Sequence, residues 1–235
     1  MSSRHLVGEP VAWRPVPRPA RETLQGVQVL LRPIATDADA EPLYEVSHPP
    51  GGDPAIWTYL FGGPYSSVGD LHRALVDAQA SEDPLFFTIV RLPDGVPLGV
   101  ASYLRITPEH GVIEIGNIWF GTPLQRTTAA TEAIYLLVRH AFDDLGYRRL
   151  EWKCNALNAA SRRAAERFGF RFEGVFRNHM VVKGRNRDTA WYAITGDEWP
   201  AIRAGFERWL SPANFDAAGA QRNSLRELID ESRDA

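Results

Sequence analysis

Apolar and polar residues alternate along the first half of the chain and predict several short strands. Val27, Val29 and Leu31 form one such pattern, which ends at Pro33. Three further strand-like runs follow at residues 85–91, 98–106 and 112–120. The gaps between these runs are short, and strands joined by short connections usually pair antiparallel. An antiparallel meander is therefore expected in this region.

Helical spacing replaces alternation in several other segments. Helices are predicted at about 37–47, 70–79, 129–145 and 158–168, with a last helix beginning near Asp197. Gly146 and Gly169 follow two of these helices, where glycine commonly ends a helix. Further strands are predicted at residues 150–154, 175–182 and 189–195. The order of elements predicts an α/β (α+β) fold with a mixed, mostly antiparallel sheet of six to seven strands flanked by helices.

The chain length of 235 residues favours one compact domain with an extension at each end. Residues 1–25 are rich in proline and arginine and predict an extended arm. Residues 26–210 carry the regular patterns and form the predicted domain. Residues 211–235 are polar and predict a frayed tail.

Charge and composition exclude several classes of protein. There are 26 lysines and arginines against 29 aspartates and glutamates, a net charge of -3, which argues against a nucleic-acid partner. No apolar run reaches the roughly 20 residues that span a bilayer, so no membrane association is expected. We expect a soluble cytoplasmic protein. Cys154 is the single cysteine and the six histidines lie far apart, so no disulfide and no metal site are expected. A buried, inert Cys154 is favoured over a nucleophile.

Two polar or aromatic segments have open interpretations. The loop from His48 to Gly69 is rich in proline and glycine and contains Trp57, Tyr59, Phe61 and Tyr65. These rings line an acceptor pocket or plug a small satellite core. The segment 183–188, with Arg185, Arg187 and Asp188, is a predicted hairpin tip. This tip either contacts an acidic acceptor or is simply exposed to solvent, and solvent exposure is the default interpretation.

The most informative segment runs from Glu114 to Glu132. A strand ends there, a tight turn follows, and a helix begins with small residues. The free backbone N–H groups at such a helix start bind anions, and a diphosphate suits several donors at once. The simpler interpretation is an ordinary helix cap by Thr127 or Thr128.

Within this segment, Gln125-x-x-Thr128-x-Ala130 resembles the Q/R-x-x-G-x-G/A coenzyme A loop of the GNAT N-acetyltransferase superfamily. Downstream motifs resemble its RimJ/RimL-type branch of ribosomal-protein N-terminal acetyltransferases. These motifs are Thr131-Glu132-Ala133, His140-Ala141-Phe142, Leu145-Gly146-Tyr147-Arg148-Arg149, Asn158-x-x-Ser161 and Gly169-Phe170-x-x-Glu173-Gly174. The resemblance covers about residues 27–209.

The resemblance implies a GNAT fold in which the fourth and fifth strands splay apart in a V. Acetyl-CoA, the implied cosubstrate, would place its pantetheine arm against the backbone of Ile118, Trp119 and Phe120. The diphosphate would meet the amides of Gln125, Arg126, Thr127, Thr128, Ala129 and Ala130. Thr128 departs from the family pattern, which has glycine there. Asn158 and Ser161 match residues that contact the pantetheine and sulfur end of the cofactor, and Asn158 also suits a helix N-cap.

Acetyl transfer requires a neutral amine, a donor for the oxyanion and an acid for the departing thiolate. A backbone N–H near Trp119 or Phe120 is the expected oxyanion donor. The family's usual tyrosine acid is replaced by Ala165, and Ser161 is the expected substitute. Glu114 is the expected base, because it lies on the fourth strand upstream of the implied notch, where a carboxylate or an ordered water chain could accept the ammonium proton. The base position that some branch members use holds Met180 here.

Further residues are candidates for the base and for contact with the acceptor. His179 and Glu173 are further candidates for the base. For each of the two carboxylates, Glu114 and Glu173, a structural ion pair is the competing role. The acceptor is expected to contact Trp57, Tyr59, Tyr65 and His179.

The predicted function is therefore transfer of an acetyl group from acetyl-CoA to a primary amine by direct attack in a ternary complex. The acceptor is a protein or peptide N-terminus, or a small-molecule amine. The alternative is a non-catalytic acyl-CoA-binding or interaction module with the same fold. A homodimer formed through the last strands is a further expectation.

Overall fold

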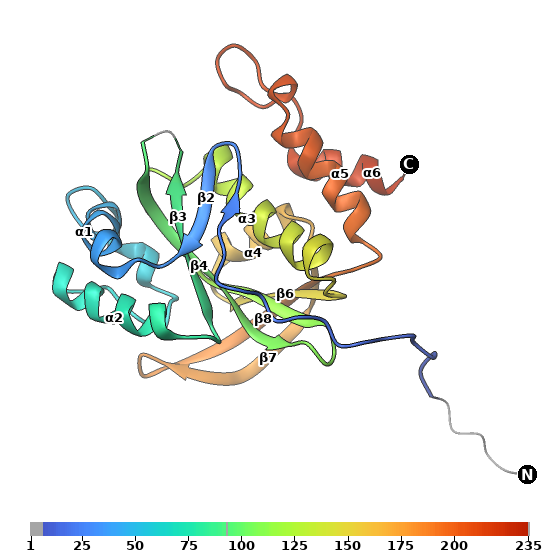
Figure 1. Cartoon of the computed structure of the whole chain (residues 1–235), viewed down its shortest axis with the longest axis horizontal. Coiled ribbons are helices and arrows are strands. Elements are labelled where there is room, and N and C mark those ends of the chain that lie inside the picture. The colour runs from blue at the N-terminus through green and yellow to red at the C-terminus, as the bar shows by residue number, and fades with distance from the viewer. Residues whose placement is uncertain (1–6, 93, 235) are drawn as a thin grey trace, which may run out of the picture.

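The fold is built on a single eight-stranded sheet (Figure 1). The computed structural model describes residues 7–92 and 94–234. The strand order is β1-β2-β3-β4-β5-β6-β8-β7. The strands are β1 (Leu24–Gln25), β2 (Val29–Pro33), β3 (Leu85–Arg91), β4 (Val96–Thr107), β5 (Val112–Phe120), β6 (Arg149–Asn155), β7 (Arg171–Val182) and β8 (Arg185–Thr195). Only β5 and β6 pair parallel. The predicted mixed, mostly antiparallel sheet is confirmed, with the short β1 as an additional strand.

Six α-helices flank the sheet. They are α1 (Thr36–Ser47), α2 (Val68–Ala80), α3 (Thr128–Arg139), α4 (Ala159–Arg167), α5 (Trp199–Leu210) and α6 (Leu225–Arg233), and α3 continues into a π-helical turn at His140–Asp144. None of the helices in the described ranges is both long and apolar enough to cross a membrane.

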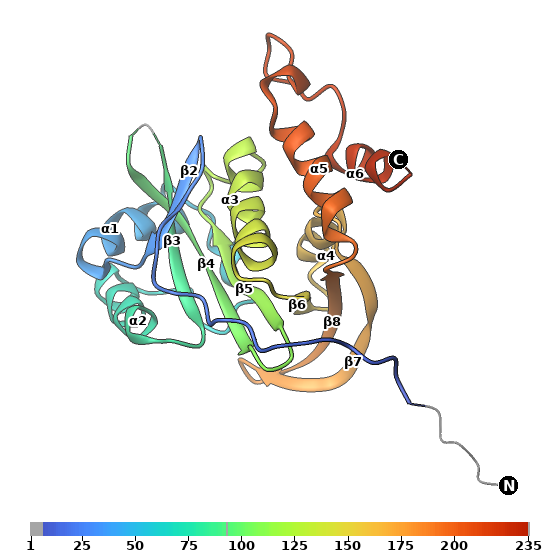
Figure 2. The same ribbon diagram turned by 45° about the vertical axis from the view of Figure 1, so that its right-hand side comes forward.

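Two hydrophobic cores lie on opposite faces of the sheet. Because side chains alternate along a strand, Phe87 of β3 joins the large core under α3, whereas Phe86 packs on the smaller core under α1 and α2. The same alternation in β4 sends Ala101 to the large core and Val100 to the smaller one. Figure 2 shows α3 separated from the α1 and α2 pair by the strands. This division leaves the region between β5 and β6 as the place where the two faces meet.

A buried carboxylate ties α3 to the start of the sheet. Glu132 is 5% exposed, and its oxygens accept the backbone N–H groups of Val27, Gln28 and Val29 at 2.7 to 3.0 Å. The turn passes so close that a Cβ on Gly26 would lie 2.7 Å from this carboxylate. The contact fixes the position of the first turn of α3 relative to β2.

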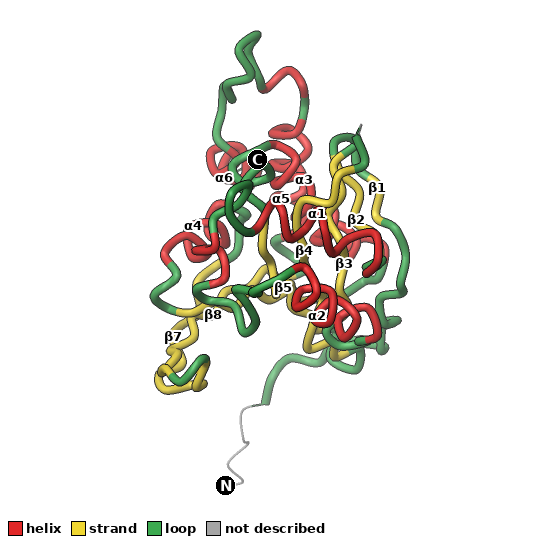
Figure 3. Tube along the Cα trace, turned by 90° about the vertical axis from the view of Figure 1, so that its left-hand side faces the viewer, coloured by secondary structure: helices red, strands yellow, loops and turns green. Residues whose placement is uncertain are grey.

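The chain ends behave differently from each other. Residues 7–23 form no helix or strand, as expected for an extended arm, and Trp13 Nε1 donates to Glu109 O at 2.8 Å. The frayed tail predicted for 211–235 is wrong, because α6 lies beside α5 (Figure 3). Leu225, Leu228 and Ile229 are buried at helical spacing, which gives this polar segment an apolar stripe.

The hairpin between β7 and β8 is tighter than the sequence predicts. Its turn consists of Lys183 and Gly184, which both have positive φ, at 50° and 71°. Strand β8 therefore already begins at Arg185, and Arg187 is not at a solvated tip. Arg187 is 7% exposed and pairs with Met180 across the hairpin.

We predict that Glu132→Ala lowers the free energy of unfolding by about 2 to 4 kcal/mol, because three backbone N–H groups lose a charged acceptor. Urea denaturation at neutral pH measures the change. The matched control is Glu41→Ala, an exposed helical glutamate in α1, which should change the free energy by less than about 0.5 kcal/mol. Equal effects for the two variants would contradict the proposed tie.

Candidate active site

The two parallel strands separate partway along their length. Pairing between β5 and β6 runs from Val112 with Arg149 to Ile115 with Trp152. Strand β5 continues to Phe120 and β6 continues to Asn155 without pairing to each other. The separation leaves backbone groups on the facing edges free for another extended chain.

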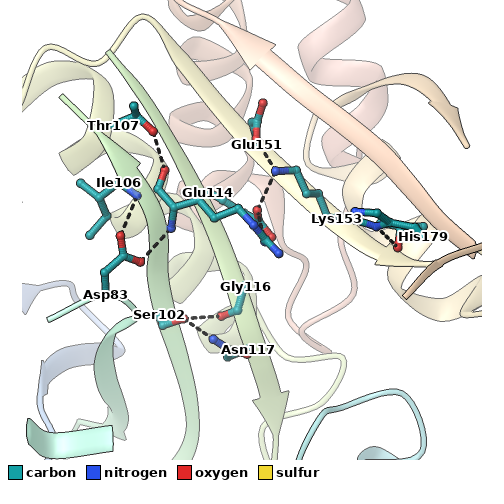
Figure 4. Close-up of polar contacts among 12 residues, drawn as sticks. Asp83, Ser102, Ile106, Thr107, Glu114, Gly116, Asn117, Glu151, Lys153 and His179 are labelled. Atoms are coloured by element: carbon teal, nitrogen blue, oxygen red, sulfur yellow. Dashed lines mark hydrogen bonds and ion pairs between the residues drawn. The ribbon is translucent and has the colours of Figure 1, made fainter. Parts of the chain in front are cut away.

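A β-bulge shapes the free edge of β5. Ser102 of β4 pairs with Gly116 and Val100 pairs with Trp119, so Asn117 and Ile118 together face one residue of β4. Asn117 has φ of 51° and donates from Nδ2 to Ser102 Oγ at 3.0 Å. Figure 4 shows Ser102 between Gly116 and Asn117. The sequence analysis missed this bulge, and the Gly-Asn pair inside an otherwise apolar strand was its signal.

The start of α3 presents free backbone donors. Thr127 is the N-cap, and its hydroxyl accepts from Ala130 N at 3.1 Å. Gln125 N donates to Thr122 O at 3.3 Å. Between them, the N–H groups of residues 126–129 have no partner within residues 7–92 and 94–234. The capping interpretation and a free anion site therefore hold together at one helix start.

Side chains around this helix start are already engaged. Thr128 Oγ1 donates to Gln28 Oε1 at 2.6 Å, and Gln125 Nε2 donates to Phe120 O at 2.9 Å. Ala129 and Ala130 are buried, whereas Arg126 is exposed and has φ of 60°. At this helix start the backbone amides are therefore free, whereas the Thr128 and Gln125 side chains are engaged.

Ser161 and Asn158 lie at the start of α4, across from β5. Asn158 is the N-cap, and its Oδ1 accepts from Ser161 N at 3.1 Å. Ser161 Oγ accepts from the indole Nε1 of Trp152 at 3.0 Å. Because that bond uses a lone pair, the hydroxyl hydrogen of Ser161 remains available to donate. Cys154 is buried, and burial raises the pKa of its thiol.

A cavity of about 110 Å³ lies between the separated strands, the β7–β8 hairpin and the loop after α1. It brings together Glu114, Ser161, Asn158, Tyr59 and His179. Ile118 and Met180 also line it, whereas Trp119, Phe120 and the start of α3 do not. His179 Nδ1 lies 3.0 Å from Thr189 Oγ1. One end of the predicted site is therefore enclosed, and the other end is the open start of α3.

Glu114 belongs to a buried ionic network (Figure 4). It is 3% exposed, and its Oε2 lies 2.6 Å from Arg105 Nη1 and 3.0 Å from Lys153 Nζ. Lys153 Nζ also lies 2.6 Å from Glu151 Oε2. Burial raises the pKa of Glu114 and outweighs the opposing effect of the two cations. Both of these contacts are made by Oε2 of Glu114 rather than by Oε1.

Lys153 was missed by the sequence analysis. It follows Arg149 and Glu151 at every second position of β6, on the face opposite Leu150 and Trp152, so the alternation was its signal. Its side chain is 5% exposed and its Nζ lies 3.7 Å from the ring centroid of Trp191. Such placement of a lysine requires carboxylate partners on both sides.

Glu173 is not part of the cavity. It pairs with Arg149, with Oε1 2.8 Å from Arg149 Nη1, and its side chain is 41% exposed. The hydrogen bond from Arg149 lowers the pKa of Glu173. The interpretation of Glu173 as a base is therefore replaced by that of a structural ion pair.

The aromatic residues of the loop after α1 take two different roles, packing in the smaller core and lining the cavity. Trp57 is 3% exposed and packs with Tyr65 and Trp119 in the smaller core, so neither Trp57 nor Tyr65 lines the cavity. The expectation that these two rings contact the acceptor remains a prediction, and in the structure both rings pack in the smaller core. Tyr59 and Phe61 do line the cavity.

The same loop is tied down across the separated strands. The Tyr59 hydroxyl donates to Leu157 O at 3.2 Å. Lys183 Nζ donates to the carbonyls of Trp57, Gly62 and Gly63 at 2.6 to 3.0 Å. Contacts from both β6–α4 and the β7–β8 turn therefore hold the loop over the cavity. In the described ranges no group of three or more His, Cys, Asp or Glu side chains could hold a metal ion.

Comparison with known proteins agrees with this geometry. A crystal structure of a GCN5-related N-acetyltransferase from Brucella melitensis is 45% identical, with a TM-score of 0.89 over 93% of this chain and 99% of that one. A Bacillus subtilis protein named "Putative ribosomal N-acetyltransferase YdaF" is 26% identical over 150 residues, 61% of this chain and 78% of that protein.

A more distant fold relative is the microcin C7 self immunity acetyltransferase MccE, in complex with acetyl-CoA and AMP. It is 22% identical with a TM-score of 0.60, covering 72% of this chain and 93% of that one. The family model for the acetyltransferase (GNAT) domain matches residues 28–171, more than half of the chain. With the separated parallel strands and the free helix start that the structure shows, this match places the chain in the GNAT acetyltransferase family.

Proposed function

We propose that this protein transfers an acetyl group from acetyl-CoA to a primary amine by direct attack in a ternary complex. The observation that carries the proposal is the parting of β5 and β6 after Ile115 and Trp152, with free helix amides at one end and Ser161 at the other. A thioester cofactor requires both an extended-chain edge and an anion site. The structural relative MccE carries acetyl-CoA, in support of the same cofactor here.

The pantetheine arm lies along the unpaired edge of β5 in this proposal. Gly121 N donates to Leu98 O of β4, and hydrogen bonds alternate along an antiparallel pair, so the amide of Phe120 faces away from β4. Ile118 lines the cavity at the other end of the edge. The diphosphate then meets the free amides of residues 126–129, and Gln28 holds the Thr128 hydroxyl aside.

The chemistry follows from the groups at the cavity. Glu114 Oε1 accepts a proton from the acceptor ammonium, and the neutral nitrogen attacks the thioester carbonyl carbon. A C–N bond forms while the C–S bond breaks, and a backbone N–H on the edge of β5 stabilises the oxyanion. Ser161 donates its hydroxyl proton to the departing thiolate, giving CoA thiol, and regains a proton through water from the cationic nitrogen of the tetrahedral intermediate, which becomes the neutral amide. The proton on Glu114 passes to solvent.

The closed loop favours a small amine over a protein N-terminus. The hydrogen bond from Tyr59 to Leu157 and those from Lys183 to three loop carbonyls hold the loop over the cavity. A peptide must displace this loop to enter. A small acceptor needs no such displacement. The relative YdaF is named as a ribosomal N-acetyltransferase, so the N-terminus of a ribosomal protein is the competing class of acceptor.

We predict that acetyl-CoA binds one molecule per chain, and that acetyl-pantetheine, which lacks the diphosphate, binds at least about 100-fold more weakly. Isothermal titration of the purified protein with each donor measures the difference. Equal affinities would show that the start of α3 does not bind the diphosphate.

Ser161→Ala should lower kcat by about 10²-fold or more, with the dissociation constant of acetyl-CoA nearly unchanged. The reason is that the departing thiolate loses its proton donor while the cofactor keeps its backbone contacts. Release of CoA thiol measures kcat, and titration measures binding. Ser66→Ala, an exposed serine outside the cavity, is the control and should match the parent protein. If the protein only binds acetyl-CoA, the parent protein releases no CoA thiol and Ser161→Ala has no kcat to lower.

Glu114→Gln should reduce kcat/KM by about 10²-fold or more and remove the acid limb of its pH profile. A base must be ionised, so the parent rate rises with pH through a Glu114 pKa that burial holds above the usual 4.5. Glu173→Gln, at the exposed ion pair with Arg149, should keep both the rate and the acid limb. An unchanged acid limb in Glu114→Gln would assign the base to another group, with His179→Gln as the next variant to measure.

A further inference from the structure

Arg187 is a buried arginine whose Nε has no hydrogen-bond partner in the described part of the chain. It is 7% exposed and lines the cavity. No carboxylate pairs with the guanidinium within the described residues. Burial lowers the pKa of Arg187, yet an arginine remains charged at neutral pH. Buried charges in folded proteins are otherwise paired, so this one lacks the group that would compensate its desolvation.

The other cations of the cavity are already compensated. Arg105 and Lys153 both contact Glu114 Oε2. Lys153 also contacts Glu151, so Arg187 is the lining cation without an ion pair in the described ranges, and it leaves an excess of positive charge in the cavity. A bound anion would remove that excess.

The missing anion is not the diphosphate of the cofactor. The residues at the start of α3 that offer free amides do not line this cavity. The lining near Ser161 and Asn158 is the thioester end of the proposed cofactor site. The anion that Arg187 can bind therefore belongs to the acceptor.

We propose that the acceptor is a small amine that also carries an anionic group, a carboxylate or a phosphate, which Arg187 binds while the ammonium lies at Glu114. This inference rests on the proposed acetyl transfer and names its substrate class. A guanidinium binds either anion through two parallel hydrogen bonds. The two charges of such an acceptor match two groups that line the cavity, the Glu114 carboxylate and the Arg187 guanidinium, whose Nε has no hydrogen-bond partner among the described residues.

The surrounding side chains hold Arg187 in place. Phe61 lies with its ring centroid 4.9 Å from the guanidinium carbon. Phe61 belongs to the loop that Lys183 ties to the hairpin carrying Arg187. The guanidinium is therefore fixed before an acceptor arrives, which lowers the entropic cost of binding. Purely cationic amines such as spermidine are disfavoured by the excess positive charge.

The experiment compares acceptors in matched pairs. CoA release is measured with β-alanine and β-alaninamide, with phosphoethanolamine and ethanolamine, and with spermidine. The anionic member of at least one pair should have a kcat/KM about tenfold or more above its neutral partner. The pair that shows the preference distinguishes carboxylate from phosphate.

Substitution of Arg187 then tests the assignment. Arg187→Gln should raise the KM of the preferred anionic acceptor by about 30-fold or more, with the neutral partner nearly unaffected. Arg187→Lys keeps the positive charge but loses the paired N–H donors of the guanidinium, so its KM for the anionic acceptor should lie between those of the parent and of Arg187→Gln. It replaces Arg187→Gln in this test if that variant does not fold. Arg185→Gln, an exposed arginine at the end of the same hairpin, is the control and should retain the full preference. An equal loss for anionic and neutral acceptors would mean that Arg187 is only structural and would overturn the proposal.

Failure of the proposed function has a separate signature. Absence of acetyl-CoA binding overturns acetyl transfer itself. If acetyl-CoA binds and no acceptor in the panel is acetylated, β-alanine and phosphoethanolamine are titrated into the CoA-saturated protein. Binding that Arg187→Gln removes supports the anion site, and no binding of either compound overturns it.

Discussion

The parting of β5 and β6 is the constraint on which the rest of the site depends. Their parallel pairing ends at Ile115 and Trp152, and a bulge at Asn117 and Ile118 shapes the free edge of β5. Unpaired backbone groups in the middle of a sheet are costly unless another chain or ligand meets them. The proposed binding of the cofactor as an extended strand would resolve this cost, with Asn158 lining the cavity between the strands and the start of α3 lying outside it.

Burial of charge gives the cavity its chemical character. Lys153 bridges Glu114 and Glu151 with little solvent access, and Arg149 contacts the second oxygen of Glu151. Within the described part of the chain, the Nε of Arg187 is the cavity atom that remains without a partner. Glu114 and Arg187 line the same cavity, and this pair of opposite charges is the basis for proposing an acceptor that carries both signs of charge.

Local sequence signals predicted much of the framework. The run 85–91 and the run 112–120 became β3 and β5 with the predicted bounds, and Asn158 and Thr127 became helix caps. These features depend on alternation, helical period and capping within a few residues. The tail at 225–233 shows the limit of such signals, because its three apolar residues gain an apolar partner only when α6 packs on α5.

The sequence by itself determined the order of elements, the helix caps and the family of the chain, since each is written in neighbouring residues. Only the tertiary structure decided which groups share the cavity. Arg187 reads as part of a polar tip until the turn is seen to be two residues long, and a shift along a strand moves a side chain to the other face. Trp57 and Phe61 are four residues apart, yet one fills the smaller core and the other lies against Arg187. Such assignments depend on contacts between residues far apart in the sequence, such as Trp57 with Trp119 and Phe61 with Arg187, which local patterns do not encode.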